Sequence, residues 1–218
     1  MEVKEGETYT IELKYKAAAE GTVSNVFVDM YERKVAQFDE LAEKVKEADA
    51  IIYVGGITPS QEGEGHERAT IELPAVQRRF LQAMHETGKP VIYVNCSGSC
   101  VGFEGIEHAY DALLQAWCPG QEGGTAVADI LYGKISRSAK LSVSYPNTEV
   151  YEPICYNYST RQDARVEWPF GYGLSYTTFA YKNLQAVKEL STASESSNIY
   201  FEVTNTGKVR ADEIAQVY

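Results

Sequence analysis

The sequence predicts an α/β fold, a flavodoxin-like parallel sheet covered by helices, over roughly residues 31–145. Segments 50–54 and 90–95 are continuous apolar runs, as in strands that are buried on both faces of a sheet. Segments with apolar residues at helical spacing alternate with them. Glycine and proline mark where these helices begin and end. This alternation favours a parallel sheet, with pieces of β-strand added at both ends of the chain.

The first thirty residues predict two strands that have no partner sheet in this sequence. Residues 8–15 alternate between polar and apolar side chains with period two, and residues 24–30 form a second short apolar segment. A lone hairpin is marginally stable in water. Residues 1–30 are therefore predicted to be the remnant of an upstream β-domain or insert.

The α/β elements then follow in order along the chain. The first helix is predicted over residues 32–48, because Val35, Phe38, Leu41, Ala42 and Val45 share one face. The remaining predicted elements are a strand at 50–54, a helix at 74–87 ended by Gly88, strands at 90–95 and 112–117, and a helix at 125–132 ended by Gly133.

The pattern changes after Pro146, where Tyr, Pro, Asn and Arg dominate and periodicity is lost. A long irregular connector is predicted there, followed by strands at 198–204 and 214–218 around a turn at 205–207. So few strands do not make an independent β-sandwich. The predicted domains are 1–30, 31–179 and 180–218.

Composition excludes several classes of partner. The net charge of −11 argues against nucleic-acid and anionic-membrane partners, because both require a basic face. The sequence has no apolar run long enough for a transmembrane helix, and its start lacks the apolar core of a signal peptide. Its compartment stays open. The four cysteines lack metal-ligand spacing, so they are predicted to be structural and no metal site is expected: Cys96, Cys100, Cys118 and Cys155.

Residues 60–68, Ser-Gln-Glu-Gly-Glu-Gly-His-Glu-Arg, form the segment on which the functional prediction depends. This acidic loop lies just past the carboxyl end of the strand at 50–54. Open α/β sheets bind ligands at that edge. Glycines let the backbone approach a ligand closely, and a carboxylate placed there is a candidate general acid or base.

Five motifs in this order resemble the C-terminal domain of glycoside hydrolase family 3. The acidic loop followed by Ile-Glu-Leu-Pro is the first, and Val-Asn-x-Ser-Gly-Ser at 94–99 is the second. The other three are Ala-Trp-x-Pro-Gly-Gln-Glu-Gly-Gly at 116–124, Pro-Phe-Gly-Tyr-Gly-Leu-Ser-Tyr-Thr at 169–177, and Val-Thr-Asn-Thr-Gly at 203–207. The last resembles the start of the fibronectin type III-like domain that follows in many members.

The resemblance implies a retaining exo-β-glycosidase that acts on oligosaccharides or on aryl and alkyl glycosides and needs no cofactor. Family members place an aspartate nucleophile on an N-terminal barrel and the glutamate acid/base on the α/β domain. That barrel is not in this sequence, so the chain is expected to be inactive alone. Glu64 is the expected acid/base residue, and Glu62 is the runner-up.

The resemblance also assigns supporting residues. Arg68 is expected to pair with a carboxylate and fix the loop. Glu67 stands where the family has aspartate, and its longer side chain is expected to keep a pair with Arg68. His66 is a candidate substrate contact. The segments 136–143 and 160–167 depart from the family's usual pattern.

Two alternatives remain open. Asn95, Ser97 and Ser99 together with 76–78 favour a β-xylosidase, whereas the short Glu-Gly-x-acid-Arg sequence favours a β-glucosidase. The departures from the family pattern favour a non-catalytic carbohydrate-binding or accessory module.

Overall fold

The computed structural model describes residues 38–65, 67–146, 166–185 and 198–217. The chain divides into two units, 1–35 and 36–218. The first unit, with the strands predicted at 8–15 and 24–30, lies outside the described residues.

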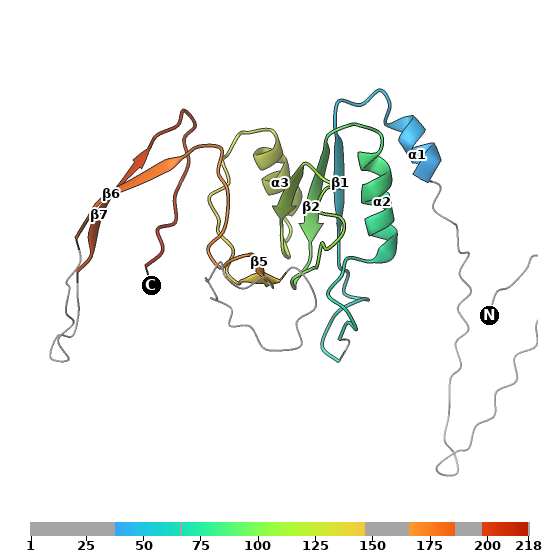
Figure 1. Ribbon diagram of the computed structural model, residues 1–218, viewed down its shortest axis with the longest axis horizontal. Coiled ribbons are helices and arrows are strands. Elements are labelled where there is room, and N and C mark those ends of the chain that lie inside the picture. Colours follow the sequence, from blue (N-terminus) through green and yellow to red (C-terminus); the bar gives the residue numbers. More distant parts are fainter. Residues whose placement is uncertain (1–37, 66, 147–165, 186–197, 218) are drawn as a thin grey trace, which may run out of the picture. The chain divides into compact units, whose positions relative to one another are not determined.

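A three-stranded parallel sheet confirms the predicted fold class (Figure 1). Its strands are β1 (Ile51–Gly56), β2 (Val91–Cys96) and β3 (Ala112–Gln115), in the order β1-β2-β3. Tyr53 is opposite Tyr93 in the register of β1 and β2, and Tyr93 is opposite Leu113 in that of β2 and β3. The predicted strand at 112–117 ends early because the chain turns at Trp117, whose φ is 53°.

Three helices in the described ranges accompany this sheet. They are α1 (Phe38–Lys44), α2 (Ala75–His85) and α3 (Gly123–Leu131). Two lie close to the predicted positions, whereas the helix predicted over residues 32–48 ends early, at Lys44, and its first residues, 32–37, lie outside the described residues. In Figure 1, α2 and α3 lie on opposite sides of the sheet, and α1 lies beside α2. None of the helices in the described ranges is long and apolar enough to span a membrane.

The core lies between α2 and the sheet. Leu81 and Met84 of α2 are fully buried, as are Val91 and Tyr93 of β2. Burying each such side chain contributes about 1.5–3 kcal/mol. The other face of β1 is open among the described residues, where Ile52 and Val54 are 49% and 61% exposed.

The C-terminal part contains two antiparallel pairs. Strand β4 (Tyr145–Pro146) pairs with β5 (Val166–Trp168), which the sequence had assigned to an irregular connector. Trp168 packs on Tyr145 with ring centroids 5.4 Å apart, so this pair attaches to the core.

Strand β6 (Phe179–Gln185) pairs with β7 (Tyr200–Asn205), and this corrects one prediction. The strand near 198–204 exists, but its partner is β6 and not the segment predicted at 214–218. Residues 214–217 form no strand, and Tyr218 lies outside the described residues. The domain boundaries at 30 and 179 stay predictions.

Candidate active site

Three loops meet at the carboxyl edge of the sheet. They follow β1, β2 and β3, whose carboxyl ends lie at one edge because the strands are parallel. A Cβ built on Gly98, after β2, would lie 3.9 Å from Glu62 Oε1, after β1, and 3.5 Å from Cys118 Sγ, after β3. The acidic loop therefore lies against the loop after β2 at this edge.

The segment that leads into the acidic loop leaves the sheet at Gly56, which is held rigidly. The Gly56 amide donates to Gln77 Oε1 at 2.9 Å, and Gln77 Nε2 donates to the Gly56 carbonyl at 2.7 Å. Gly56 has a φ of +131°, and a Cβ there would collide with the carbonyl group of Cys96. Only glycine fits this position, so the loop starts from a fixed point.

Arg68 holds the acidic loop, residues 60–68, through hydrogen bonds to four groups. Its Nε donates to Glu62 Oε2 at 2.7 Å. Its Nη2 donates to Ser99 Oγ and to the Cys100 carbonyl, each at 2.9 Å, and its Nη1 donates to the Ile71 carbonyl at 3.3 Å. The side chains of Arg68 and Glu62 are 14% and 28% exposed, so this ion pair is shielded from solvent more than a surface pair is.

The end of the segment is fixed by Arg78 and by the loop after β2. Arg78 Nη1 lies 2.6 Å from Glu72 Oε2, an ion pair without hydrogen-bond alignment, while Nη2 donates to the Glu104 carbonyl at 2.8 Å. Gly102 donates to the Ile71 carbonyl at 2.8 Å. Arg78 thus joins the ends of two neighbouring loops.

The tip between these attachments is exposed. Glu64 and Glu67 face solvent, and neither has a hydrogen bond or an ion pair within the described ranges. Gly65 has a φ of +72° and open space around its Cα. The candidate substrate contact His66 lies outside the described residues. Glu64 and Glu67 are therefore the carboxylates that the loop exposes, whereas Glu62 is bound into it.

The structure differs from the sequence prediction in the partner of Arg68. That partner is Glu62 and not Glu67, because neighbouring side chains diverge while the turn at Glu64 and Gly65 brings Glu62 back to the guanidinium. Sequence reasoning also missed Ser99, Gln77 and Arg78 as supports of this segment. Ser99 was part of a recognised motif, but nothing in the sequence pairs it with residues more than thirty positions away.

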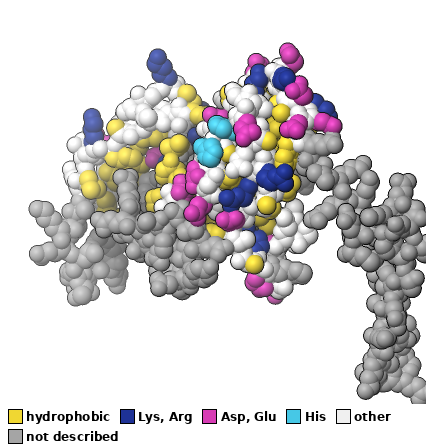
Figure 2. Space-filling view, turned by 45° about the vertical axis from the view of Figure 1, so that its right-hand side comes forward, with side chains coloured by type: hydrophobic (Ala, Val, Ile, Leu, Met, Phe, Trp, Pro, Cys, Tyr) yellow, Lys and Arg dark blue, Asp and Glu magenta, His cyan; other side chains and the backbone are white. Residues whose placement is uncertain are grey.

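The described ranges contain no group of three or more His, Cys, Asp or Glu residues that could hold a metal ion. Their two histidines, His85 and His108, form an edge-on pair with ring centroids 5.9 Å apart, visible in cyan in Figure 2. Cys96, Cys100 and Cys118 are free thiols, and Cys155 lies outside the described residues. Burial raises the pKa of the Cys100 thiol to about 11.

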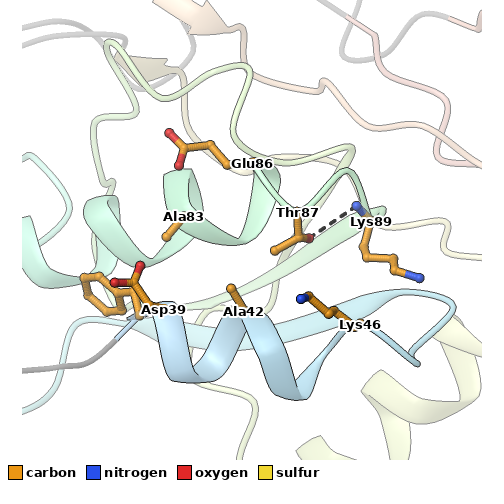
Figure 3. Close-up of a pocket in the computed structure, with 8 residues that line it drawn as sticks. Asp39, Ala42, Lys46, Ala83, Glu86, Thr87 and Lys89 are labelled. Carbon is orange, nitrogen blue, oxygen red and sulfur yellow. Dashed lines mark hydrogen bonds between the residues drawn. The ribbon is translucent and has the colours of Figure 1, made fainter.

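A hollow of about 260 Å³ lies between α1 and α2 (Figure 3). Part of its wall comes from residues 86–89, which directly precede β2 and so lie at the amino edge of the sheet. The acidic loop is at the opposite edge. The wall contains two lysines and two carboxylates, so its charge favours neither an anionic nor a cationic ligand. The lining residues are Phe38, Asp39, Ala42, Lys46, Ala83, Glu86, Thr87 and Lys89.

The chain is similar to glycoside hydrolases in sequence. It is 38% identical to a xylan 1,4-beta-xylosidase of Xylanibacter ruminicola over 100% of its own length and 27% of that protein. It is 31% identical to a periplasmic beta-glucosidase of Salmonella typhimurium, over 88% of the chain and 28% of that protein. The chain thus spans little more than a quarter of the curated relatives that it matches.

Solved structures give the same result. A beta-glucosidase from Listeria innocua in complex with glucose matches with a TM-score of 0.72 and 28% identity, over 81% of this chain and 27% of that one. A family 3 beta-glucosidase of Bifidobacterium adolescentis matches with a TM-score of 0.71 and 30% identity, over 83% and 30%. Residues 4–176 match the Glycosyl hydrolase family 3 C-terminal domain, and the chain therefore belongs to that family.

Proposed function

We propose that this chain is the acid/base-bearing domain of a retaining exo-β-glycosidase and that Glu64 is its acid/base residue. One observation carries the proposal: Glu64 is exposed, has no hydrogen bond or ion pair within the described ranges, and lies between Glu62 and Arg68, which are paired with each other. Glu67 shares this exposure, and the family resemblance selects Glu64 between the two. Relatives of this chain bear the names of β-glucosidases and β-xylosidases, which supports the reaction class. The whole enzyme would act on terminal β-linked sugars without a cofactor.

The chemistry assigns one proton transfer to Glu64 in each of two steps. A retaining glycosidase holds two carboxyl groups about 5–5.5 Å apart, one to attack the sugar and one to protonate the leaving oxygen. Glu64 would donate that proton and then, as a carboxylate, take a proton from the attacking water. The nucleophile would come from a barrel outside this chain. Closure of the barrel over Glu64 would exclude water and favour the protonated acid.

Glu62 suits this role less well, because its Oε2 already accepts hydrogen bonds from Arg68 Nε and Ser99 Oγ. A general acid must offer its own proton to the leaving oxygen. Glu62 is better suited to fixing the loop, and Arg68 acts with it. Glu67 is exposed like Glu64, but the family resemblance places the acid/base at Glu64, so we assign Glu67 no direct step.

The substrate is either a β-glucoside or a β-xyloside. The identity to a xylan 1,4-beta-xylosidase, 38% against 31% for the periplasmic beta-glucosidase, favours the xyloside, as do the residues 95–99 after β2. The short acidic loop favours the glucoside. Comparing the hydrolysis of 4-nitrophenyl β-xyloside and β-glucoside by the whole enzyme would decide between them.

A non-catalytic module is the rival function, supported by the unusual segment 136–143. In the structure this segment pairs with the motif at 169–177: Leu141 donates to the Tyr172 carbonyl at 2.8 Å, and Lys140 Nζ donates to the Gly173 carbonyl at 2.8 Å. Its unusual residues therefore bear on packing and leave the acidic loop unaffected.

The deciding experiment replaces Glu64 in the whole enzyme. Glu64→Gln should reduce the hydrolysis of natural oligosaccharides by about 10²–10⁴-fold, the usual contribution of general acid catalysis, and should spare substrates with a good leaving group. Glu67→Gln is the matched control, since this second exposed glutamate lies on the same loop. Equal losses on both substrate types, or no loss, would reject the role of Glu64.

A further inference from the structure

Ser99 joins the acidic loop to the loop after β2 through one hydroxyl group. Ser99 Oγ donates to Glu62 Oε2 at 2.5 Å and accepts from Arg68 Nη2 at 2.9 Å. Because Arg68 Nε also donates to the same Glu62 oxygen, the three side chains form a closed triangle of hydrogen bonds. Both partners of Ser99 are charged, and hydrogen bonds to charged groups are stronger than those between neutral groups.

Ser99 is itself held by a polar network that the sheet supports. Ser97 Oγ donates to the Ser99 carbonyl at 2.6 Å, and Ser97 is 1% exposed. Gln115 Nε2, at the end of β3, lies 3.4 Å from the Ser97 carbonyl, and Asn95 Nδ2 donates to Gln115 Oε1 at 2.6 Å. The backbone of Ser99 is thus tied to β2 and β3, and its hydroxyl extends from there to Glu62 and Arg68.

A hydroxyl is required because the group must donate and accept at once. Serine and threonine do both, whereas alanine does neither. Without the hydroxyl, Arg68 still reaches the Cys100 carbonyl and Glu62, so the loop would loosen without unfolding the domain.

We propose that Ser99 is a positioning residue: it fixes Glu62 and Arg68, and through them the ends of the exposed tip that carries Glu64. This inference rests on the proposed function for what the tip presents. The hydrogen bonds themselves do not depend on Glu64 being the acid.

Hydrogen exchange of the full chain, followed by mass spectrometry, tests the proposal. Ser99→Ala should speed the exchange of amides in residues 60–68 by about tenfold, the effect of losing a hydrogen bond to a charged group. Peptides from β1, β2 and β3 should exchange as before. Ser99→Thr should restore slow exchange, since it keeps the hydroxyl. Ser136→Ala is the matched control: Ser136 is also partly buried and bonds another serine, Ser175, at 2.9 Å, far along the chain from the acidic loop.

Exchange at 60–68 that is unchanged in Ser99→Ala would overturn the proposal. So would equal acceleration in Ser99→Thr, or acceleration across the whole sheet, which would indicate a general loss of stability. Activity separates this failure from that of the proposed function. If Glu64→Gln shows the leaving-group dependence while Ser99→Ala leaves the loop unchanged, only the positioning role is rejected. If Ser99→Ala loosens the loop while Glu64→Gln has no effect, only the role of Glu64 is rejected.

Discussion

The Arg68 guanidinium donates to the Glu62 carboxylate across 2.7 Å, and this ion pair closes the turn at Glu64 and Gly65. The two carboxylates that the sequence left as candidates are thereby separated by their surroundings. Glu62 lies inside the pair and Glu64 lies on the turn, exposed to solvent. Under the proposed function, this division leaves Glu64 available to the second domain while Glu62 stabilises the loop.

Replacing Arg68 should destabilise the domain as well as the loop. Arg68→Ala removes donors to four groups and leaves the partly buried Glu62 without its cation. Breaking a shielded pair from one side costs about 3 kcal/mol, and we expect a loss of that order in the free energy of unfolding measured in urea. The exposed Arg210→Ala should change it by less than about 0.5 kcal/mol. A loss below about 1 kcal/mol for Arg68→Ala would mean that the pair is weak.

Replacing Gly56 and Gly88 with alanine should have different costs, because Gly56 is required for both space and backbone conformation, whereas Gly88 is required for conformation alone. Both have positive φ, but a Cβ on Gly56 collides with Cys96, whereas one on Gly88 meets nothing within 4 Å. Gly88→Ala should cost about 1–2 kcal/mol, the usual penalty of a left-handed residue. Gly56→Ala should cost at least about 3 kcal/mol because the strand ends must also separate. Similar melting temperatures for the two variants would contradict the close approach of Gly56 to β2.

The fold class and most elements could be predicted because they depend on local pattern. Apolar runs and glycine stops placed β1, β2, α2 and α3 within a few residues. The errors arose where the formation of a strand depends on which other strand it pairs with. Strand β7 needed β6 as its partner, and no local property of residues 214–217 shows that they lack one.

The same limit applies to the site. The acidic loop could be found from its composition and its place after a strand, and the family resemblance selected Glu64. The partner of Arg68 could not be found, because Glu62, Glu67 and Glu72 are all near it in sequence and only the turn decides which carboxylate meets the guanidinium. Ser99 and Gln77 form hydrogen bonds to residues that are distant in sequence, and the local sequence pattern does not indicate such contacts.

The cysteines should differ in their reactivity with pH. Burial is the main cause that raises the pKa of Cys100, from 9.0 to about 11, with nearby Glu62 raising it further and Arg68 opposing both. Only the thiolate reacts with iodoacetamide, so at pH 8 the exposed Cys118 should be modified well before Cys100. Peptide mass spectrometry of the folded chain checks this order. The chain unfolded in urea is the control, because both thiols should then react at similar rates.

The raised pKa of Cys100 also predicts the direction of alkaline destabilisation. Below pH 9 the thiol is protonated in both the folded and the unfolded chain, so its contribution to stability does not change. Between pH 9 and about 11 the unfolded chain releases this proton while the folded chain retains it, and stability falls as pH rises. Replacing Cys100 with serine should reduce this fall, seen as a smaller drop in melting temperature from pH 9 to 10.5. An unchanged drop would mean that the Cys100 thiol does not contribute to the alkaline loss of stability.

The isolated chain should not hydrolyse aryl β-glycosides. Retaining hydrolysis needs a nucleophile as well as an acid/base residue, and the proposed function assigns the nucleophile to a barrel outside these residues. Glu64 is exposed to solvent, as expected for a residue that a second domain would cover. We expect 4-nitrophenyl β-glucoside and β-xyloside to release nitrophenol at the buffer rate, with Glu64→Gln as the matched control. Turnover by the pure chain that disappears in Glu64→Gln would show that the chain carries its own nucleophile, and the division of labour between two domains would then be wrong.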